Sequence, residues 1–348
     1  AMQPSVRIAV DPHSTQLQRP RLVPHWDEVP AEQLSEEISK AGIVGLGGAA
    51  FPSHVKMRPP EDQPVDVLMV NGCECEPSLT SDHRTMLEQP HRVHQGIRIV
   101  LRALGINRAV IGIENNKPDA IAVMRETAPD DLDVTVMELQ VKYPQGAEKM
   151  LIKAVTGREV PSGKLPSSVG ALVQNVATTA SVAKVFETGE PLIERIMTIS
   201  GRGIRQPGNW VIPFGTRLRD VITACGGFTE DAAEIVFGGP MMGQSQASLD
   251  VPVLKATGGI LVLSKDECKH QEILPCIRCG KCVDACPVFL NPQHLGALAR
   301  VDRFEEMVEA NLGDCMLCGC CSFVCPSNIP LSQLFAMSKI QLGRLAAA

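Results

Sequence analysis

The chain has 348 residues, of which 44% are hydrophobic and 21% charged, a composition typical of a globular protein with two or three domains. Aromatic residues make up only 3% and the net charge is −6, which argues against a nucleic-acid binder. No apolar stretch approaches the roughly 20 residues that a membrane span needs. The 13 cysteines are clustered rather than scattered, which favours the cytoplasm or another reducing compartment.

The first 190 residues alternate between helical and strand patterns. Residues 1–30, rich in Pro, Arg and His, are expected to form an extended N-terminal arm. The pattern then predicts, in chain order, a helix at 32–40, a glycine turn at 45–52, a strand at 65–70, a helix at 92–104, a strand at 109–113, a helix at 119–126 and a strand at 134–139. Such alternation predicts an α/β domain over 31–190 with a largely parallel sheet.

The pattern changes after Gly189. Short strands separated by Gly and Pro are expected at 196–200, 208–212 and 259–263, with one helix at 218–225. They predict a small α+β domain over 193–264. The remainder, 265–348, carries two cysteine runs joined by helical stretches at 292–300, 303–311 and 331–345. The predicted fold class is therefore a multidomain α/β and α+β protein that ends in a helical, ferredoxin-like domain.

Two cysteine runs share the pattern C-x2-C-x2-C-x3-C-P. Their members are Cys276, Cys279, Cys282 and Cys286 before Pro287, and Cys315, Cys318, Cys321 and Cys325 before Pro326. This spacing is typical of 4Fe–4S clusters, whereas zinc ribbons, the alternative, usually present two C-x2-C halves a dozen or more residues apart.

In paired ferredoxin-like modules the fourth cysteine of each run binds the other cluster. One cluster is therefore predicted on Cys276, Cys279, Cys282 and Cys325, and the other on Cys315, Cys318, Cys321 and Cys286.

Other cysteines and histidines have no such pattern. Cys320, beside a predicted ligand, is interpreted as a bystander. The thiols expected to be ordinary buried groups are Cys73, Cys75, Cys225 and Cys268. The histidines expected to be surface or capping residues rather than metal ligands are His83, His91 and His94.

Two loops in the first domain suggest a nucleotide-like ligand. Gly45-Leu-Gly-Gly-Ala-Ala50 matches G-x-G-x-x-A, but a helix is expected before it and a strand only later, which is the wrong context for the dinucleotide fingerprint. The loop is either a turn or a phosphate cradle, with Lys56 within reach. The second loop carries Glu74 and Glu76 after a predicted buried strand, and is either a solvated turn or a site for ribityl or ribose hydroxyls.

Four motifs, in this order, resemble those of the flavin- and NADH-binding subunit of respiratory complex I. They are Gly45-x-Gly-Gly-x-x-Phe-Pro52 with Lys56, Asn71-x-x-Glu-x-Glu-Pro77, Tyr143-x-x-Gly-x-Glu148 and Gln174-Asn-Val-Ala-Thr178. The longer sequences around these motifs resemble more closely the C subunit of the Rnf-type electron transport complex. The resemblance is clearest in Asn71-Gly-Cys-Glu-Cys-Glu-Pro-x-Leu-Thr-x-Asp-His-Arg84 and Tyr143-Pro-Gln-Gly-Ala-Glu-Lys149. The double cysteine run also separates this chain from the complex I subunit, which ends in a single-cluster domain.

The resemblance implies specific ligand contacts. The residues implied to hold the FMN phosphate are Gly45, Gly47, Gly48 and Lys56, and those implied to hold the ribityl chain and ring are Asn71, Glu76, Asn175 and Thr178. Phe51 would flank the nicotinamide nucleotide, with Glu148 nearby. The same motifs add Glu74, Tyr143 and Gly146 to the implied cofactor-binding residues. No side chain is expected to act as a catalytic acid or base.

The sequence departs from the complex I pattern at two places. Met57-Arg58-Pro59 stand where that subunit has aromatics for adenine stacking, and Ala147 replaces the first of two paired glutamates. Both departures weaken the inference to NADH more than the inference to flavin. The middle domain resembles the soluble ligand-binding β-grasp module of both families, whose ligand the sequence does not identify.

By resemblance, the expected function is electron transfer between NADH, FMN and two 4Fe–4S clusters. Flavin links a two-electron hydride donor to one-electron clusters. The chain would be a peripheral subunit on the cytoplasmic side of the inner membrane, docked on other subunits that couple ferredoxin and NAD redox to ion transport. Two alternatives stay open: a soluble cobalamin reductase of bacterial microcompartments, and a non-catalytic iron–sulfur adaptor whose glycine loop binds nothing. Flavin content would identify the adaptor.

Overall fold

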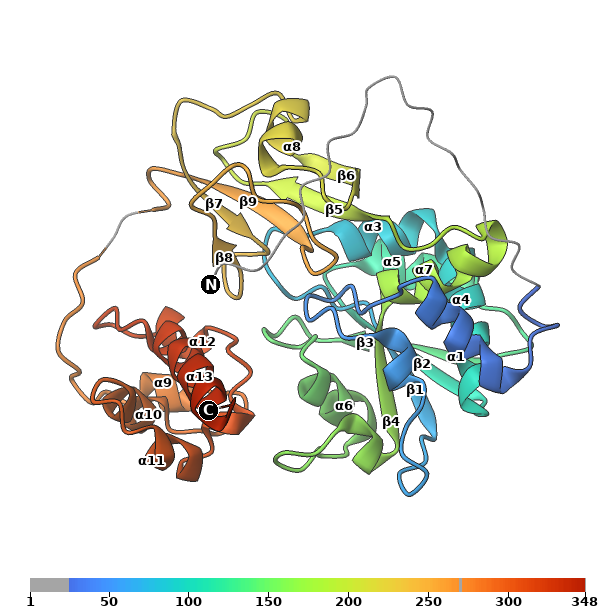
Figure 1. The fold of residues 1–348 in the computed structure, drawn as a ribbon, viewed down its shortest axis with the longest axis horizontal. Helices are drawn as coiled ribbons and strands as arrows, with labels where there is room; N and C mark the ends of the chain where they lie inside the picture. The colour runs from blue at the N-terminus through green and yellow to red at the C-terminus, as the bar shows by residue number, and fades with distance from the viewer. Residues whose placement is uncertain (1–24, 269–270, 348) are drawn as a thin grey trace.

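The computed structural model describes residues 25–268 and 271–347, and in it the chain folds into three modules (Figure 1). A parallel sheet flanked by helices comes first, a mixed sheet follows, and a group of helices ends the chain. We name them the first domain (25–192), the middle domain (193–268) and the cluster domain (271–347).

The first domain is built on a four-stranded parallel sheet with the order β3-β2-β1-β4. Its strands are β1 (Val67–Asn71), β2 (Arg108–Glu114), β3 (Asp133–Leu139) and β4 (Ala171–Asn175). β1 is an almost unbroken apolar run because helices cover both faces of a parallel sheet. The register of β1 against β4 places Asn71 directly beside Asn175, so two predicted site residues meet at the carboxyl edge of the sheet.

Helices flank this sheet and position the loops at its edge. They are α1 (Ala31–Lys40), α2 (Ser53–Lys56), α3 (Ser81–Glu88), α4 (Pro90–Leu104), α5 (Pro118–Glu126), α6 (Glu148–Thr156) and α7 (Val176–Thr188), with a 3-10 turn at Pro166–Val169. α4 and α7 pack so closely that a Cβ on Gly96 would lie 2.0 Å from the carbonyl oxygen of Thr179. Glycine is therefore required at that helix crossing.

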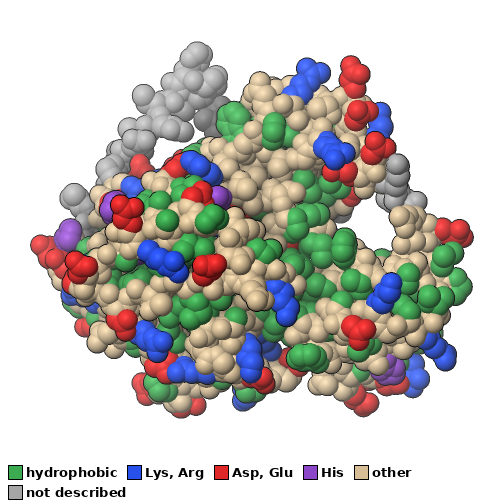
Figure 2. Space-filling view, turned by 180° about the vertical axis from the view of Figure 1, so that it is seen from behind, with side chains coloured by type: hydrophobic (Ala, Val, Ile, Leu, Met, Phe, Trp, Pro, Cys, Tyr) green, Lys and Arg blue, Asp and Glu red, His purple; other side chains and the backbone are tan. Residues whose placement is uncertain are grey.

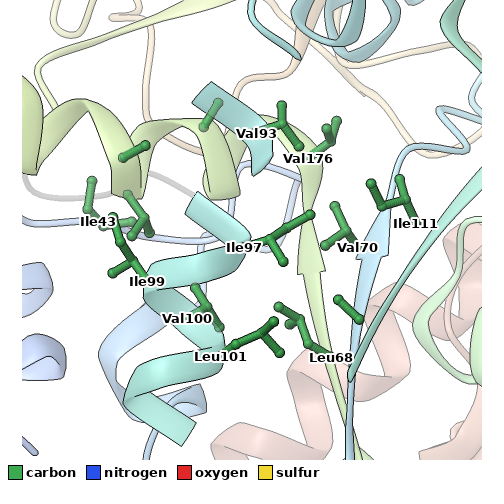
Figure 3. Packing of buried hydrophobic residues seen from close by; sticks show 14 of the residues in the cluster. Ile43, Leu68, Val70, Val93, Ile97, Ile99, Val100, Leu101, Ile111 and Val176 are labelled. Atoms are coloured by element: carbon green, nitrogen blue, oxygen red, sulfur yellow. The ribbon is translucent and has the colours of Figure 1, made fainter. Parts of the chain in front are cut away.

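The largest apolar core lies between α4 and the sheet. Ile97 and Leu101 of α4 point toward Val70 and Leu68 of β1 (Figure 3). All four side chains are at most 3% exposed, and each such burial contributes about 1.5–3 kcal/mol. This packing fixes β1, and with it the loop that leaves its carboxyl end.

The middle domain is a five-stranded mixed sheet with the order β6-β5-β9-β7-β8. Its elements are β5 (Glu194–Ser200), β6 (Gly208–Pro213), α8 (Leu218–Ala224), β7 (Ala232–Phe237), β8 (Gln244–Ser245) and β9 (Gly259–Ser264). α8 packs on the sheet through Leu218 and Ile222, which join a core with Met197 and Ile260. Phe214 packs against both this core and that of the first domain, so the two domains share an apolar contact.

The cluster domain consists of short helices around the two cysteine runs and a longer C-terminal helix. They are α9 (Lys281–Asp284), α10 (Pro292–Ala299), α11 (Phe304–Glu309), a 3-10 turn at Leu312–Asp314, α12 (Cys320–Phe323) and α13 (Leu331–Ala347). The two runs repeat each other in backbone conformation: Gly280 and Gly319, at equivalent positions, have φ values of +80° and +81°. Each glycine precedes a four-residue helix, α9 or α12. The domain is therefore an internal repeat.

The helices and strands expected from the sequence are confirmed, most to within two residues at each end. Residues 1–24 of the expected arm lie outside the described residues. Its last part, 25–30, forms a turn instead of an extended segment, because Val29 is buried in the first core and Trp26 lies under the guanidinium of Arg102. Among the described helices, none is long and apolar enough to cross a membrane.

Candidate functional site

The glycine loop is closed at its base by backbone pairing of Val44 with Pro52. The Gly45 amide donates to the Phe51 carbonyl oxygen at 2.8 Å. Gly48 has φ +110°, in the region that favours glycine, and a Cβ there would meet nothing within 4 Å. α1 precedes the loop and β1 comes later, as expected, so the loop lacks the strand–loop–helix context of the dinucleotide fingerprint.

The glycine loop lies against the N-terminus of α7. Thr178 accepts a hydrogen bond from the Leu46 amide at 2.7 Å, and a Cβ on Gly47 would lie 3.4 Å from that of Asn175. Asn175 caps the helix by accepting from the amides of Ala177 and Thr178 at 3.0 and 3.2 Å. A helix N-terminus beside a glycine loop favours an anion, because amide donors and the helix dipole both point to it.

Lys56 and Glu148 come together although they are far apart in the sequence. The Lys56 Nζ donates to Glu148 Oε1 at 2.7 Å and to the Val173 carbonyl oxygen at 3.1 Å. Lys56 follows the glycine loop on α2, and Glu148 is the first residue of α6. Phe51, at the end of the same loop, is 46% exposed.

The loop after β1 is folded around Asn71. The Asn71 Nδ2 donates to the Gly146 carbonyl oxygen at 2.8 Å, and its Oδ1 accepts from the Cys73 amide at 3.1 Å. The Gly146 amide in turn donates to the Cys75 Sγ at 3.3 Å. Lys117, which is 6% exposed, donates to the Cys73 carbonyl oxygen at 2.6 Å. The acidic loop and the tyrosine motif are therefore one connected structure rather than a solvated turn.

Glu74 points inward and caps α3. Its carboxylate accepts from the amides of Asp82 and His83 at 2.8 and 3.0 Å. Burial raises the pKa of Glu74 to about 7, with a further increase from the negative charge of Asp82. Burial also raises the pKa of Asp82, whose Oδ2 accepts from Asn175 at 2.6 Å while its buried Oδ1 has no hydrogen-bond partner.

Glu76 reaches the middle domain. Its Oε1 accepts from the amides of Met241 and Met242 at 2.6 and 3.0 Å. A Cβ on Gly239 would lie 2.1 Å from the Cγ of Glu76, so that turn needs glycine to admit the glutamate. The turn at residues 239–243 of the middle domain thus binds the acidic loop of the first domain.

Tyr143 contacts the second cysteine run. Its hydroxyl donates to the Cys318 carbonyl oxygen at 2.7 Å, and burial raises the pKa of the Tyr143 phenol above its usual value. A Cβ on Gly319 would lie 2.7 Å from the Met241 carbonyl oxygen. All three domains therefore meet at residues 318–319.

Asp314 strengthens that contact. Its carboxylate accepts from Lys149 at 3.2 Å and from Ser162 at 2.5 Å, both in the first domain. The Ser162 hydrogen bond lowers the pKa of Asp314, so this carboxyl is ionised at neutral pH. The second run is thus docked on the first domain, next to the motif that begins at Tyr143.

Two cavities lie in the cluster domain, and each contains the fourth cysteine of the opposite run. The cysteines that line one cavity are Cys276, Cys279, Cys282 and Cys325. Those that line the other are Cys286, Cys315, Cys318 and Cys321, together with Cys320. The grouping coincides with the crossed sets expected from the spacing. Among the described residues, no three Cys, His, Asp or Glu side chains form a site for a single metal ion.

The thiols within each group are close enough to affect one another. Burial raises the pKa of Cys282, and the neighbouring Cys325, Cys276 and Cys279 raise it further. Burial and the charges of Cys315, Cys318 and Cys286 raise the pKa of Cys321 to about 12. A thiol is bound by metal as thiolate, so these groups would release protons on ligation.

The two groups differ in exposure. Every residue from 271 to 279 is exposed, including Cys276 and Cys279, whereas Cys318 and Cys321 are each 8% exposed. A Cβ on Gly280 would meet nothing within 4 Å, in contrast to its counterpart Gly319. Figure 2 shows hydrophobic side chains on the outer surface of the cluster domain, at the right of that view.

Some of the other predicted cysteines and histidines need correction. Cys75 and Cys268 are only half-buried, because the first belongs to the acidic loop and the second lies at the end of the middle domain. His94 is buried, 3% exposed, since α4 packs inside the first domain, and it contacts the Met124 carbonyl oxygen at 3.1 Å near the end of α5. His83 pairs with Asp119 at 2.8 Å.

Three charged residues near the site were not expected from the sequence. Asp82 stands inside a motif quoted above, but nothing local indicates that its carboxylate is buried against Asn175. Lys117 is the N-cap residue directly before α5, and Arg195 lies in a strand of the middle domain, where it contacts Leu46. Their roles depend on contacts between distant elements, and no sequence pattern marks them.

The residues around the glycine loop fit an FMN phosphate. The observations are the close approach of Gly47 to the capped end of α7, the open side of Gly48, and the amine of Lys56 nearby. The unpartnered oxygen of Asp82 adds a buried acceptor for a hydroxyl donor. In the cluster domain, four thiols around each cavity are the ligand set that a 4Fe–4S cluster requires.

Family models match all three domains. Residues 38–184 match the Nuo51 FMN-binding domain, 196–245 match the SLBB domain, and 272–329 match the 4Fe-4S dicluster domain. These matches show an FMN-binding module followed by an SLBB module and a module for two 4Fe–4S clusters.

Curated relatives match most of the chain. The chain is 48% identical over 285 residues to the C subunit of the proton-translocating ferredoxin:NAD(+) oxidoreductase complex of Clostridium ljungdahlii, covering 82% of this chain and 62% of the relative. It is 42% identical over 325 residues to the C subunit of the ion-translocating oxidoreductase complex of Rhodobacter capsulatus, covering 93% of this chain and 62% of the relative. The chain thus spans less than two thirds of the length of these relatives.

Solved structures show the same fold at lower identity. An NAD+-reducing [NiFe]-hydrogenase in the air-oxidized state aligns with a TM-score of 0.63 and 21% identity, covering 82% of this chain and 55% of that chain. The H2-reduced state aligns with a TM-score of 0.63 and 19% identity, covering 94% of this chain and 64% of that chain. At this identity the likeness shows the fold alone.

Proposed function

This chain is a relative of the C subunit of Rnf-type ion-translocating electron transport complexes, and on that premise we propose that it transfers electrons between NADH and a partner subunit of such a complex. The observation that carries the proposal is the docking of a double 4Fe–4S module on an FMN-binding module through Tyr143 and Asp314. The chain would be peripheral to the membrane, on its cytoplasmic side, and would reach ferredoxin only through other subunits.

The residues of the first domain would hold FMN in the following way. The glycine loop and the N-terminus of α7 would bind the phosphate, with Lys56 neutralising its charge. A bound FMN would supply the conversion between the two electrons of a hydride and the single electrons that a cluster carries. Phe51 is exposed beside this loop, where it can exclude water from a bound nicotinamide nucleotide.

Cluster ligation is proposed to be crossed. The first cavity would hold one 4Fe–4S cluster on Cys276, Cys279, Cys282 and Cys325, and the second would hold the other on Cys315, Cys318, Cys321 and Cys286. Cys320 is a fifth thiol that lines the second cavity. We assign the ligand to Cys321 and not to its neighbour Cys320, because Cys321 keeps the regular spacing of the run.

The two clusters have different surroundings, which suggests an order of transfer. The second run contacts Tyr143 of the first domain and Met241 of the middle domain, so its cluster would exchange electrons with the first domain. The first run has an exposed face formed by Cys276, Cys279 and the apolar Ile277, which is 68% exposed. We infer that a partner subunit docks on this exposed face and exchanges electrons there.

Titration with NADH tests the proposal. Protein reconstituted anaerobically with iron, sulfide and FMN should lose its flavin absorbance at roughly 450 nm on adding NADH, as reduced flavins do. NADPH serves as a comparison and FMN-free protein as the control. If the flavin binds but stays oxidised, the assignment of NADH as donor is wrong, and if no flavin binds, the non-catalytic adaptor is correct.

Replacing Tyr143 with phenylalanine should loosen the docking of the second run. The change removes one hydrogen bond to the Cys318 carbonyl oxygen, worth about 1 kcal/mol, or about fivefold in the docking equilibrium. Hydrogen–deuterium exchange of residues 312–322 should become faster by a similar factor. Thr188→Val is the control, because that hydroxyl donates to the Lys184 carbonyl oxygen and accepts from the Glu190 amide, both within the first domain. Equal exchange in Tyr143→Phe and the control would show that the hydroxyl does not hold the junction.

A further inference from the structure

Two cationic side chains of the middle domain donate hydrogen bonds to the backbone of the glycine loop and of the segment that leads into it. The Arg195 Nη2, on β5, donates to the Leu46 carbonyl oxygen at 2.9 Å. Lys255, in the segment before β9, donates from Nζ to the Gly42 carbonyl oxygen at 2.7 Å. Gly42 and Leu46 lie on the two sides of Gly45. Both cations therefore reach out of their own domain to bind backbone carbonyls of the segment that enters and forms the loop.

Arg195 is built into the structure rather than resting on its surface. It is 5% exposed, and its Nη1 donates to the Lys255 carbonyl oxygen at 2.9 Å. The two cations are thus tied to each other as well as to the loop. Burial lowers the pKa of Arg195, while the charges of Asp82 and Glu74 oppose that shift. Burial and the two hydrogen bonds to the Leu46 and Lys255 carbonyl oxygens hold the guanidinium in place.

Both backbone polar groups of Leu46 are hydrogen-bonded to side chains of other elements. Its amide donates to Thr178 at the start of α7, and its carbonyl oxygen accepts from Arg195 of the middle domain. Leu46 is 3% exposed and immediately precedes Gly47 and Gly48. Glycines lose more conformational freedom than other residues when ordered, so a Gly-Gly segment needs external contacts to be preorganised. Arg195 and Lys255 supply part of that ordering.

We propose that the middle domain is a structural part of the flavin site, with Arg195 and Lys255 as positioning residues that order the glycine loop and thereby set its affinity for the FMN phosphate. The inference rests on the proposed function for the identity of the ligand. Neither residue touches the space beside Gly48; both act through backbone carbonyls of the loop. Preorganisation of this kind raises affinity by reducing the entropy lost on binding.

Arg195→Gln and Lys255→Met test this, each with a matched control in the same domain. The control for the first is Arg205→Gln, because Arg205 donates to the Phe228 carbonyl oxygen within the middle domain. The control for the second is Lys265→Met, because Lys265 donates to the Glu230 carbonyl oxygen, also within that domain. Each control removes a cation and a bond to a backbone carbonyl without affecting the glycine loop.

Two measurements separate positioning from overall stability. Hydrogen–deuterium exchange over residues 42–50 of FMN-free protein should accelerate in Arg195→Gln and Lys255→Met but not in the controls. The FMN dissociation constant should rise about tenfold in Arg195→Gln and about threefold in Lys255→Met, and Arg195→Lys should recover part of the loss. Unfolding midpoints report whether each variant is folded, and Lys255→Met decides the question if Arg195→Gln does not fold.

The outcomes distinguish this inference from the proposed function. Unchanged exchange in the loop, or FMN affinities within about twofold of the controls in folded variants, would overturn the positioning role. If wild-type protein binds no FMN while the loop still loosens in the variants, the proposed function fails and the ordering of the loop by the middle domain stands.

Discussion

Replacing Cys325 with alanine should remove the cluster of the first run, although Cys325 belongs to the second. Cys325 lines the cavity formed by Cys276, Cys279 and Cys282, so its loss leaves that cluster with three protein ligands. Cys286→Ala should do the reverse and remove the cluster held by the second run. Each variant should retain one cluster, so iron content should fall by about half of the reconstituted wild-type value.

Thiol labelling identifies which cluster is lost. After anaerobic reconstitution, alkylation followed by peptide mass spectrometry should modify the first-run thiols in Cys325→Ala and leave those of the second run protected. EPR should show the spin–spin interaction of two reduced clusters replaced by a single isolated signal. Cys320→Ala is the control, because it removes a thiol from the second cavity while leaving both predicted ligand sets intact. Labelling confined to the run that carries the substitution would show that ligation is not crossed.

Replacing Lys56 with methionine should weaken FMN binding by about 10- to 100-fold, the loss of one charge-assisted hydrogen bond of about 1.5–3 kcal/mol. Lys56 lies on α2 directly after the glycine loop, where its amine pairs with Glu148. Methionine keeps most of the side-chain length and packing, so the loss reports the charge. The dissociation constant of FMN, from quenching of flavin fluorescence, is the measurement, and it should become less sensitive to salt as the charge is removed.

Lys153→Met is the matched control, because Lys153 lies on α6 and pairs with Glu159 on the surface. Its FMN affinity should stay within about twofold of wild type, as expected for an exposed ion pair remote from the loop. Riboflavin, which lacks the phosphate, provides a second comparison, and Lys56→Met should leave its binding unchanged. An equal loss for FMN and riboflavin would mean that Lys56 acts on the loop rather than on the phosphate.

Most of the fold could be predicted where an element carries a clear apolar pattern and its ends carry turn or capping residues. The strand expected at 109–113 and the helix expected at 92–104 are present as β2 and α4. α7 was not predicted as a helix, because nearly every side is buried and its Ala, Val and Thr residues show no polar stripe. β4 was missed as well, since it is only five residues long and continues directly into α7.

The candidate site could be predicted only where its residues lie in local motifs. Gly47 and Lys56 come from one motif and Asn175 from another, and the fold brings the two motifs together at the carboxyl edge of the sheet. Arg195 and Lys117 act through backbone carbonyls of other elements, and such contacts follow from tertiary structure rather than from spacing. The sequence motifs also gave no indication that Glu76 and Tyr143 would contact the neighbouring domains.

The internal repeat of the cluster domain has a consequence for the proposed path of electrons. Two clusters in equivalent halves of a repeat would by themselves give electrons no preferred point of entry. Here a Cβ on Gly319 would lie 2.7 Å from the Met241 carbonyl oxygen, whereas a Cβ on its counterpart Gly280 would meet nothing within 4 Å, so packing against the middle domain makes the two halves unequal. In the proposed electron path, this contact would distinguish the end that faces the flavin-binding module from the end that a partner meets.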